Sequence, residues 1–150
     1  MSSTSEVALC NLLYRYAELM DLGQFEALAE LFERARIRMG GREPREVEGR
    51  QLLEIWRDQV ILYPCGTPRT RHVVTNPIIE LDEAAGRARV RSAYTVYQAT
   101  DELPLQVIAL GRYHDEFERY DGSWHFVFRD YSMLDLAGEL RYHLRSAVPP

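Results

Sequence analysis

The first part of the chain has apolar residues every three or four positions, which is the spacing of one helix face. Thr4 or Ser5 can cap a first helix, and Asp21–Leu22–Gly23 ends it. Residues 25–32 predict a second helix and residues 48–62 a third, with a short strand over 36–39 and a polar loop over 40–45 between them. The inward positions expected on the first helix are Leu9, Leu12, Leu13, Tyr16 and Met20.

Near residue 70 the period changes from helical to alternating. Residues 69–79 predict a strand with His72, Val74, Asn76 and Ile78 on one face and Val73, Thr75 and Ile79 on the other. Further strands are expected over 87–96, 105–117 and 124–133, with a hairpin turn at Asp121–Gly122. Residues 135–144 are expected to form a last short helix.

This order of elements predicts the α+β class, with one domain over residues 1–150. Three N-terminal helices precede a run of long strands, so we expect a curved antiparallel or mixed sheet that wraps around the helices. Such a sheet has the shape of a cone, and the helices would enclose a cavity inside it.

Composition excludes several classes of function. The chain is 46% hydrophobic and 27% charged, and its net charge is −5, which argues against nucleic-acid binding. Lysine is absent, which excludes a Schiff-base lysine mechanism. No apolar run reaches the ~18–20 residues that a membrane span needs. Cys10 and Cys65 lie far apart without metal-like spacing, so we expect a cytoplasmic protein with reduced thiols.

Two polar residues stand in apolar surroundings. His72 occupies a strand position where packing alone favours Val or Ile, and Asp21 ends an apolar helix. We interpret them as a pair that meets in a pocket, with His72 as general base and Asp21 fixing its tautomer. The alternatives are a structural histidine and a helix-end acid that bonds the following loop.

Five segments carry a resemblance to a known family: residues 13–17 with 21–25, residues 70–76, residues 111–119, residues 121–126, and Arg129. Over roughly residues 5 to 135 the chain resembles the SnoaL-like branch of the nuclear transport factor 2-like superfamily. Scytalone dehydratase, hexachlorocyclohexane dehydrochlorinase and bile-acid dehydratase of this superfamily share a carboxylate–histidine dyad. The resemblance implies this dyad for Asp21 and His72, a supporting polar residue at Tyr16, and a pocket arginine at Arg129.

The sequence also departs from these enzymes. Scytalone dehydratase has a second pocket histidine, whereas His114 and His125 are expected to face outward here. The bile-acid dehydratase adds an acid on the next strand, where this chain has Ser92, Tyr94 and Tyr97. The dyad therefore carries over and the substrate-specific acid does not.

The remaining pocket candidates have plain structural alternatives. Tyr94 and Tyr113 offer phenols to an oxyanion or pack at the core edge. Asn76 polarises a carbonyl or bonds a backbone edge, and Arg129 holds an anionic group or pairs with a nearby acid. Trp56 is expected in the pocket wall or the core. The four histidines lack metal-ligand spacing, and no glycine-rich phosphate loop is present, so we expect neither a metal nor a cofactor.

The function predicted is a cofactor-independent lyase or isomerase, foremost a dehydratase, that acts on a hydrophobic ring-containing molecule of aromatic, polyketide or steroid type. The alternatives are a non-catalytic small-molecule-binding protein and the small subunit of an aromatic-ring dioxygenase of the same fold. Val73, Thr75 and Ile79 give the outer sheet face a β-branched surface, so we expect a homo-oligomer, a dimer or trimer.

Overall fold

The computed structural model describes residues 4–147. Its helices come first and its long strands last, as the change of period predicts. In chain order the elements are α1 (Ser5–Asp21), α2 (Phe25–Glu30), β1 (Arg36–Met39), β2 (Arg45–Glu48), the 3-10 turn Gly49–Gln51, α3 (Leu52–Gln59), β3 (Thr70–Asp82), β4 (Arg87–Gln98), β5 (Gln106–Tyr120), β6 (Ser123–Asp130) and β7 (Leu134–Ala137).

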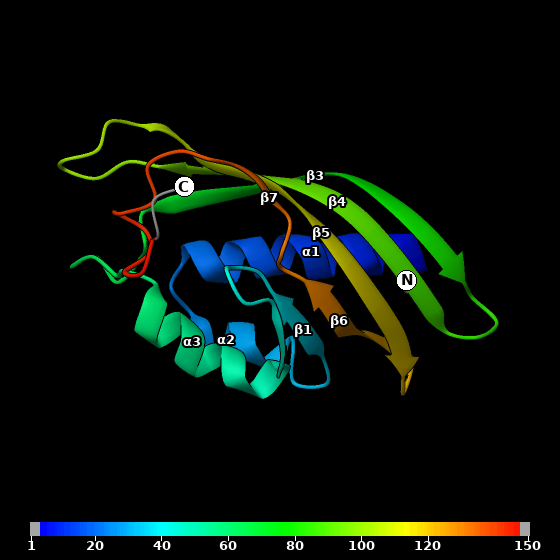
Figure 1. The fold of residues 1–150 in the computed structure, drawn as a ribbon. Helices are drawn as coiled ribbons and strands as arrows, with labels where there is room; N and C mark the ends of the chain where they lie inside the picture. The colour runs from blue at the N-terminus through cyan, green and yellow to red at the C-terminus, as the bar shows by residue number, and fades with distance from the viewer. Residues whose placement is uncertain (1–3, 148–150) are drawn as a thin grey trace.

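The strands form one mixed, curled and unclosed sheet in the order β2-β1-β6-β5-β4-β3, and β7 adds to β5. β1 and β6 run parallel, and the other pairs run antiparallel. Figure 1 shows β3, β4 and β5 arching over α1, with α2 and α3 on the same side of the sheet as α1. The predicted α+β architecture is confirmed.

The curl of the sheet follows from irregular pairing. The register shifts by one residue within β3–β4, β4–β5 and β5–β6. Each such bulge bends the bulged strand and increases the local twist. The concave face is thereby brought around α1, whose Leu9 and Leu13 are fully buried against it.

Aromatic and aliphatic side chains fill the space between the helices and the sheet. Phe32 stacks with its ring centroid 4.6 Å from that of Phe126, which lies 4.5 Å from that of Phe117. All three side chains are fully buried or nearly so. This aromatic column ties the turn after α2 to β5 and β6, and it holds the helices at a fixed depth below the sheet.

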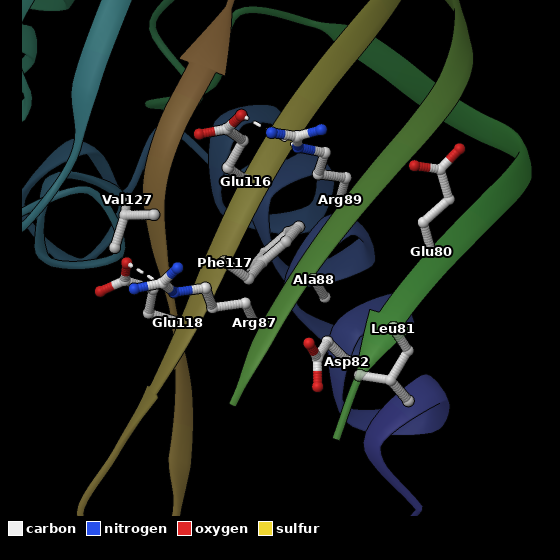
Figure 2. A pocket seen from close by; sticks show the side chains of 10 residues that line it. All are labelled: Glu80, Leu81, Asp82, Arg87, Ala88, Arg89, Glu116, Phe117, Glu118 and Val127. Atoms are coloured by element: carbon white, nitrogen blue, oxygen red, sulfur yellow. Dashed lines mark ion pairs between the residues drawn. The ribbon is translucent and has the colours of Figure 1, made fainter. Parts of the chain in front are cut away.

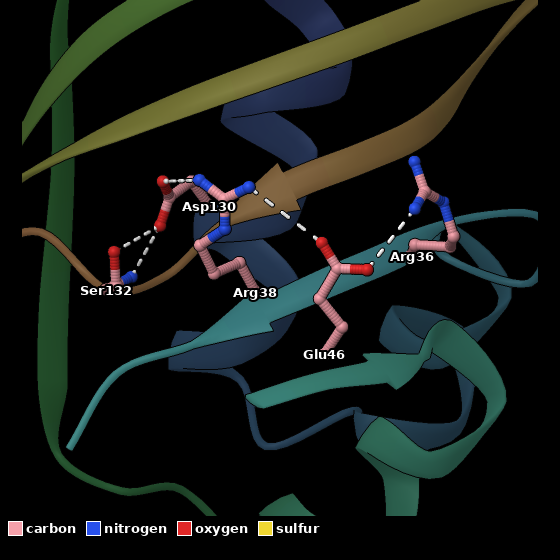
Figure 3. Close-up of polar contacts among 5 residues, drawn as sticks. All are labelled: Arg36, Arg38, Glu46, Asp130 and Ser132. Carbon is pink, nitrogen blue, oxygen red and sulfur yellow. Dashed lines mark hydrogen bonds and ion pairs between the residues drawn. The ribbon is translucent and has the colours of Figure 1, made fainter. Parts of the chain in front are cut away.

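The short strands β1 and β2 are held by ion pairs on their outer face as well as by the buried side chains of Ile37 and Val47. Figure 3 shows Arg38 between Glu46 of β2 and Asp130 at the end of β6, at 3.8 and 3.4 Å, and Arg36 paired with Glu46 at 3.2 Å. Asp130 also accepts from the Ser132 hydroxyl at 2.6 Å. The two pairs with Glu46 link β1 to β2 and the Arg38–Asp130 pair links β1 to β6; the arginines are exposed, so each pair contributes little energy by itself.

Two expected elements differ in the structure. The third helix does not run over residues 48–62: β2 occupies residues 45–48, and the helix proper is α3 over 52–59. The predicted last helix over 135–144 is wrong, because residues 134–137 form β7 against β5. The pairing of residues 134–137 with β5 outweighed the local preference of these residues for a helix.

The face assignment within β3 is correct before residue 75 and wrong after it. Thr75 pairs with Ala93 and Ile78 with Arg91, so β3 carries one extra residue. Asn76 sits in that bulge with a φ of 52°. Beyond it Ile78 is exposed, whereas Ile79 packs against the core. The prediction that Asn76 shares the inner face of His72, and the prediction that Ile79 points outward, are therefore both wrong.

Candidate functional site

The Asp21 carboxylate, at the end of α1, accepts three hydrogen bonds from the start of β3. The Thr70 hydroxyl donates to Oδ1 at 2.8 Å, and the His72 backbone N–H donates to Oδ2 at 2.8 Å. The His72 ring Nδ1 lies 2.6 Å from Oδ1. A carboxylate has acceptor sites for all three donors, and bonds to a charged group are stronger than those between neutral groups. The carboxylate is thus fixed in one orientation against the ring.

Local backbone features explain this meeting. β3 is an edge strand, so alternate N–H groups lack a strand partner, and Asp21 satisfies that of His72. Gly23 follows α1 with a φ of +69°, and a Cβ there would lie 2.3 Å from the Gly66 carbonyl oxygen. Glycine therefore lets the loop that leads into β3 pack directly on the turn after Asp21.

Only small parts of the pair reach solvent. The His72 side chain is 6% exposed and that of Asp21 12%. Because Asp21 engages Nδ1, the neutral ring carries its proton there and keeps Nε2 as the nitrogen able to accept one. The pair has the geometry of a general base with its orienting carboxylate.

Tyr16 lies next to this pair on α1. Its ring stands edge-on to His72 with a centroid distance of 6.4 Å, and edge-on to Tyr113 at 5.7 Å. It is 2% exposed. Tyr16 thus connects the histidine to the aromatic side chains farther along the inner face of the sheet.

Arg129 lies on the inner face of β6, directly opposite Asp115 of β5. Its Nε and Nη2 donate to the two carboxylate oxygens at 2.7 and 2.9 Å, and both side chains are fully buried. The guanidinium also packs 4.0 Å from the ring centroid of Tyr113 and 4.3 Å from that of Tyr16. Burial alone would lower the pKa of Arg129, but the Asp115 carboxylate outweighs it and raises that pKa, so Arg129 is charged; burial raises the pKa of Asp115, and the Arg129 charge opposes that shift.

Two tyrosines on the inner face remain protonated at neutral pH. Tyr94 stacks on Tyr113 with centroids 4.4 Å apart, and burial raises the pKa of Tyr94 to about 12. Burial also raises the pKa of Tyr113 well above its ordinary value. Both phenols are therefore hydrogen-bond donors rather than bases. Ser92, which pairs with Tyr113, has a buried hydroxyl without a hydrogen-bond partner among residues 4–147.

Two candidate residues do not join this group. Asn76 is exposed at the β3 bulge. Trp56 packs against Phe25 and Phe32, with centroids 6.3 and 6.1 Å apart, and belongs to the core between α2 and α3. The residues that the structure gathers on the concave side are Asp21, His72, Tyr16, Tyr94, Tyr113 and Arg129.

Sequence reasoning missed two neighbours of the pair. Thr70, two positions before His72 on the same strand face, holds Asp21; its place at i−2 was the available signal. His143 lies near the C-terminus with its ring centroid 6.1 Å from that of His72 and is 8% exposed. No local pattern marked His143, because the folded chain alone brings it there.

A surface hollow of about 650 Å³ lies elsewhere, over the far ends of β3, β4 and β5. Figure 2 shows the pairs Arg89–Glu116 and Arg87–Glu118 along it. These arginines alternate with buried Ala88, so they lie on the sheet face opposite His72. The hollow is therefore separate from the Asp21–His72 pair.

Within residues 4–147, no group of three or more His, Cys, Asp or Glu side chains is arranged to hold a metal ion. No helix in that part of the chain has both the length and the apolar character for crossing a bilayer.

Residues 1–130 match the model of the SnoaL-like domain family, so this chain belongs to that family. No curated protein matches the sequence. Among solved structures, a variant of Rv3472 from Mycobacterium tuberculosis, of unknown function, is 24% identical with a TM-score of 0.67, over 85% of this chain and 70% of that one.

Two structures from Novosphingobium aromaticivorans DSM 12444 are also similar. A candidate scytalone dehydratase is 22% identical with a TM-score of 0.66, covering 89% of this chain and 85% of its own. The β subunit of a candidate aromatic-ring-hydroxylating dioxygenase is 15% identical with a TM-score of 0.68, covering 91% and 94%. At these identities the likeness establishes the fold alone.

Proposed function

We propose that this protein is a cofactor-independent lyase or isomerase, foremost a dehydratase, that removes a C–H proton from a hydrophobic ring-containing ketone. The observation that carries the proposal is the 2.6 Å contact between His72 Nδ1 and an Asp21 carboxylate that two further donors hold in place. A nearly buried imidazole oriented in this way is suited to act as a general base.

The proposed dehydration begins at Nε2 of His72. This nitrogen takes the proton from the carbon next to the ketone, the electrons of that C–H bond form the C=C bond, and the neighbouring C–O bond breaks with its pair on oxygen. The imidazolium then gives its proton to that oxygen, which leaves as water, and the ring is neutral again. Asp21 stabilises the imidazolium while it exists.

Other polar atoms on the inner face suit the ketone end of the substrate. Tyr16 lies beside His72, and protonated Tyr94 and Tyr113 follow it along the sheet. Arg129 Nη1 and Ser92 Oγ are buried without partners among residues 4–147. We assign these groups to stabilising the enolate oxygen, since donors placed before the reaction lower its barrier.

Hydrogen exchange at carbon tests the proposal without knowledge of the natural substrate. Wild-type protein should speed the exchange of the α-hydrogens of 1-tetralone, a bicyclic aromatic ketone, into D₂O beyond the buffer rate, measured by NMR. His72→Ala should lose this activity, whereas His125→Ala, on the outer face of β6, should keep it. Binding of 1-tetralone without faster exchange would instead support the ligand-binding alternative.

A second candidate is the non-catalytic β subunit of a ring-hydroxylating dioxygenase, since a candidate subunit of that kind shares the fold over nearly the whole chain. A β subunit has no need for an oriented base. Exchange activity that depends on His72 would exclude this alternative, and co-purification with an α subunit together with no exchange would support it.

The proposal includes self-association through the outer sheet face. Exposed Val73 and Leu136 lie at the two ends of one cross-strand row, which runs through Thr95 and Leu110. An apolar row of this kind is a typical interface. A monomer at micromolar concentration in light scattering would contradict this part. The free thiols of Cys10 and Cys65 fit a reducing compartment, and we propose the cytoplasm.

A further inference from the structure

The C-terminal segment, defined here as residues 140–145, is fastened to the end of the molecule that contains the Asp21–His72 pair. The Tyr142 carbonyl accepts from the Tyr63 hydroxyl at 2.6 Å and from Gln98 Nε2 at 2.9 Å. The His143 carbonyl accepts from the Ile61 N–H at 2.9 Å. The segment between these contacts therefore has a fixed path, and so does the side chain it carries inward.

That side chain is His143. Its ring lies 6.1 Å from the His72 ring, centroid to centroid, with an interplanar angle of 65°. Its Nδ1 is buried and has no hydrogen-bond partner among residues 4–147. A buried polar atom without a partner costs free energy, so its persistence beside a candidate base calls for an explanation.

A second unpartnered atom lies at the same end. Gln98 is 1% exposed, and its Nε2 donates both to the Tyr142 carbonyl and to the Pro68 carbonyl. The Oε1 of the same amide is buried without a partner among the described residues. Two side chains that are fixed by the same segment thus keep hydrogen-bonding capacity that the described protein does not use.

The charge state of His143 suits a ligand contact. Burial, and next the neighbouring His72, lower the pKa of His143 to about 3, with Asp21 opposing the shift. His143 is therefore neutral at physiological pH and can donate or accept one hydrogen bond at each nitrogen. When His72 takes up a proton, no second positive charge stands beside it. A neutral histidine can still polarise a substrate oxygen.

We infer that His143 belongs to the same site as the Asp21–His72 pair and that its unpartnered Nδ1 hydrogen-bonds a hydroxyl or carbonyl oxygen of the substrate. This inference rests on the proposed function for the site, and it deepens that function by naming a substrate class. The substrate carries an oxygen substituent next to the carbon that His72 deprotonates. Gln98 Oε1 adds an acceptor that favours a hydroxyl group at this position.

The test compares two probes of similar shape, 1-tetralone and tetralin, of which only the first has an oxygen. Wild-type protein should bind 1-tetralone at least about tenfold more tightly than tetralin, which is the effect of roughly one hydrogen bond. His143→Leu should reduce this preference by weakening 1-tetralone binding alone, while the other donors assigned to the ketone oxygen maintain the rest. His143→Gln should keep part of it, and His125→Leu on the outer face should keep all of it.

Two results would overturn the inference: a wild-type protein without the preference, or a His143→Leu protein with the preference unchanged. If the leucine variant does not fold, the NMR shifts of the His143 ring decide. A change on adding 1-tetralone but not tetralin supports the contact, and no change contradicts it.

These results are independent of the exchange assay. If exchange depends on His72 but the binding preference does not depend on His143, the proposed role of the Asp21–His72 pair is supported and only the role of His143 is contradicted. If the binding preference depends on His143 but no exchange is observed, the role of His143 is supported and the proposed catalysis is contradicted.

Discussion

The Asp21–His72 pair and the Asp115–Arg129 pair both join a carboxylate to a basic side chain on the concave side of the sheet, but they differ in what remains free. In the first, the base is an imidazole held through one ring nitrogen, and its other nitrogen is left to exchange a proton. In the second, the base is permanently charged and bound bidentately, with both side chains fully buried. Tyr16 touches both pairs.

This difference predicts which pair changes its protonation state and which remains a fixed charge. The Arg129 guanidinium is a permanent charge that two of its nitrogens bind to Asp115, with aromatic rings packed over it, so it orders the interior while its Nη1 keeps a donor without a partner among residues 4–147. An imidazole whose Nδ1 is bonded to an oriented carboxylate and whose Nε2 is left free is suited to taking up and releasing a proton. Variants of the Asp115–Arg129 pair should therefore act mainly on stability, and variants of the Asp21–His72 pair on activity.

The largest effect is expected at the Asp21–His72 pair. His72→Ala and Asp21→Asn should each lower exchange activity by about 10²–10⁴-fold, the usual range for positioned acid–base groups. The double variant should lose little more, because the two side chains act as one unit. Exchange rates and a urea titration of the same samples provide the measurement. Losses that multiply in the double variant would show that the residues act independently.

Breaking the buried pair should instead unfold the protein more easily. Asp115→Ala leaves the Arg129 charge buried without its partner and should cost about 3–5 kcal/mol in the free energy of unfolding. Replacing both, as Asp115→Leu with Arg129→Met, should cost far less, because no charge is stranded. Urea unfolding measures both. Equal losses in the single and double variants would mean that packing, not charge, dominates at this site.

The free energy of unfolding should depend on pH because His143 is held neutral in the folded protein. The folded pKa of His143 is about 3, below the ordinary value of 6.5, so the unfolded chain binds the extra proton first. Stability should fall as the pH drops from 6.5 toward 3, by at most about 1.4 kcal/mol per unit from this group. His72 and Asp21 are the titratable groups that face it.

Comparison of wild type with His143→Gln isolates that contribution. The unfolding free energy of the wild type minus that of His143→Gln should fall steadily as the pH is lowered through this window. A difference that stays constant would mean that His143 is not held neutral in the folded state.

The smallest effect is expected from the residue that supports the carboxylate. Thr70→Val removes the hydroxyl that donates to Asp21 Oδ1 and keeps the shape of the side chain. Exchange activity should fall by about tenfold, which corresponds to about 1.4 kcal/mol, just below the contribution of a typical hydrogen bond to a charged group. Thr95→Val on the outer face is the matched control. Activity unchanged in Thr70→Val would assign the orientation of Asp21 to the His72 backbone N–H alone.

Sequence reasoning reached the elements whose signals are local. The change of period near residue 70, the break after Asp21 and the Asp121–Gly122 turn each lie in a few neighbouring residues, and the fold follows from them. The contact between Asp21 and His72 was expected from their polar character in apolar surroundings and was reinforced by the family resemblance, but neither spacing nor composition specifies a distance between two elements.

What could not be predicted depends on pairing at a distance. The extra residue in β3 moves Asn76 out of line with His72, and only its pairing with β4 reveals it; Pro77 was the one local hint, since proline in a strand marks edges and bulges. The tail became β7 because β5 offered it a partner. His143 was missed for the same reason.

The place of His143 also has a consequence for how the site is made. Asp21 and His72 are separated by 51 residues in the sequence, whereas His143 follows His72 by 71 residues and is synthesised after both. Contacts between segments this distant in sequence form slowly, because loop closure must come before the contact can stabilise anything. We therefore expect the Asp21–His72 contact to form before the contact of His143 with His72, so that the part of the site proposed for substrate recognition is completed last.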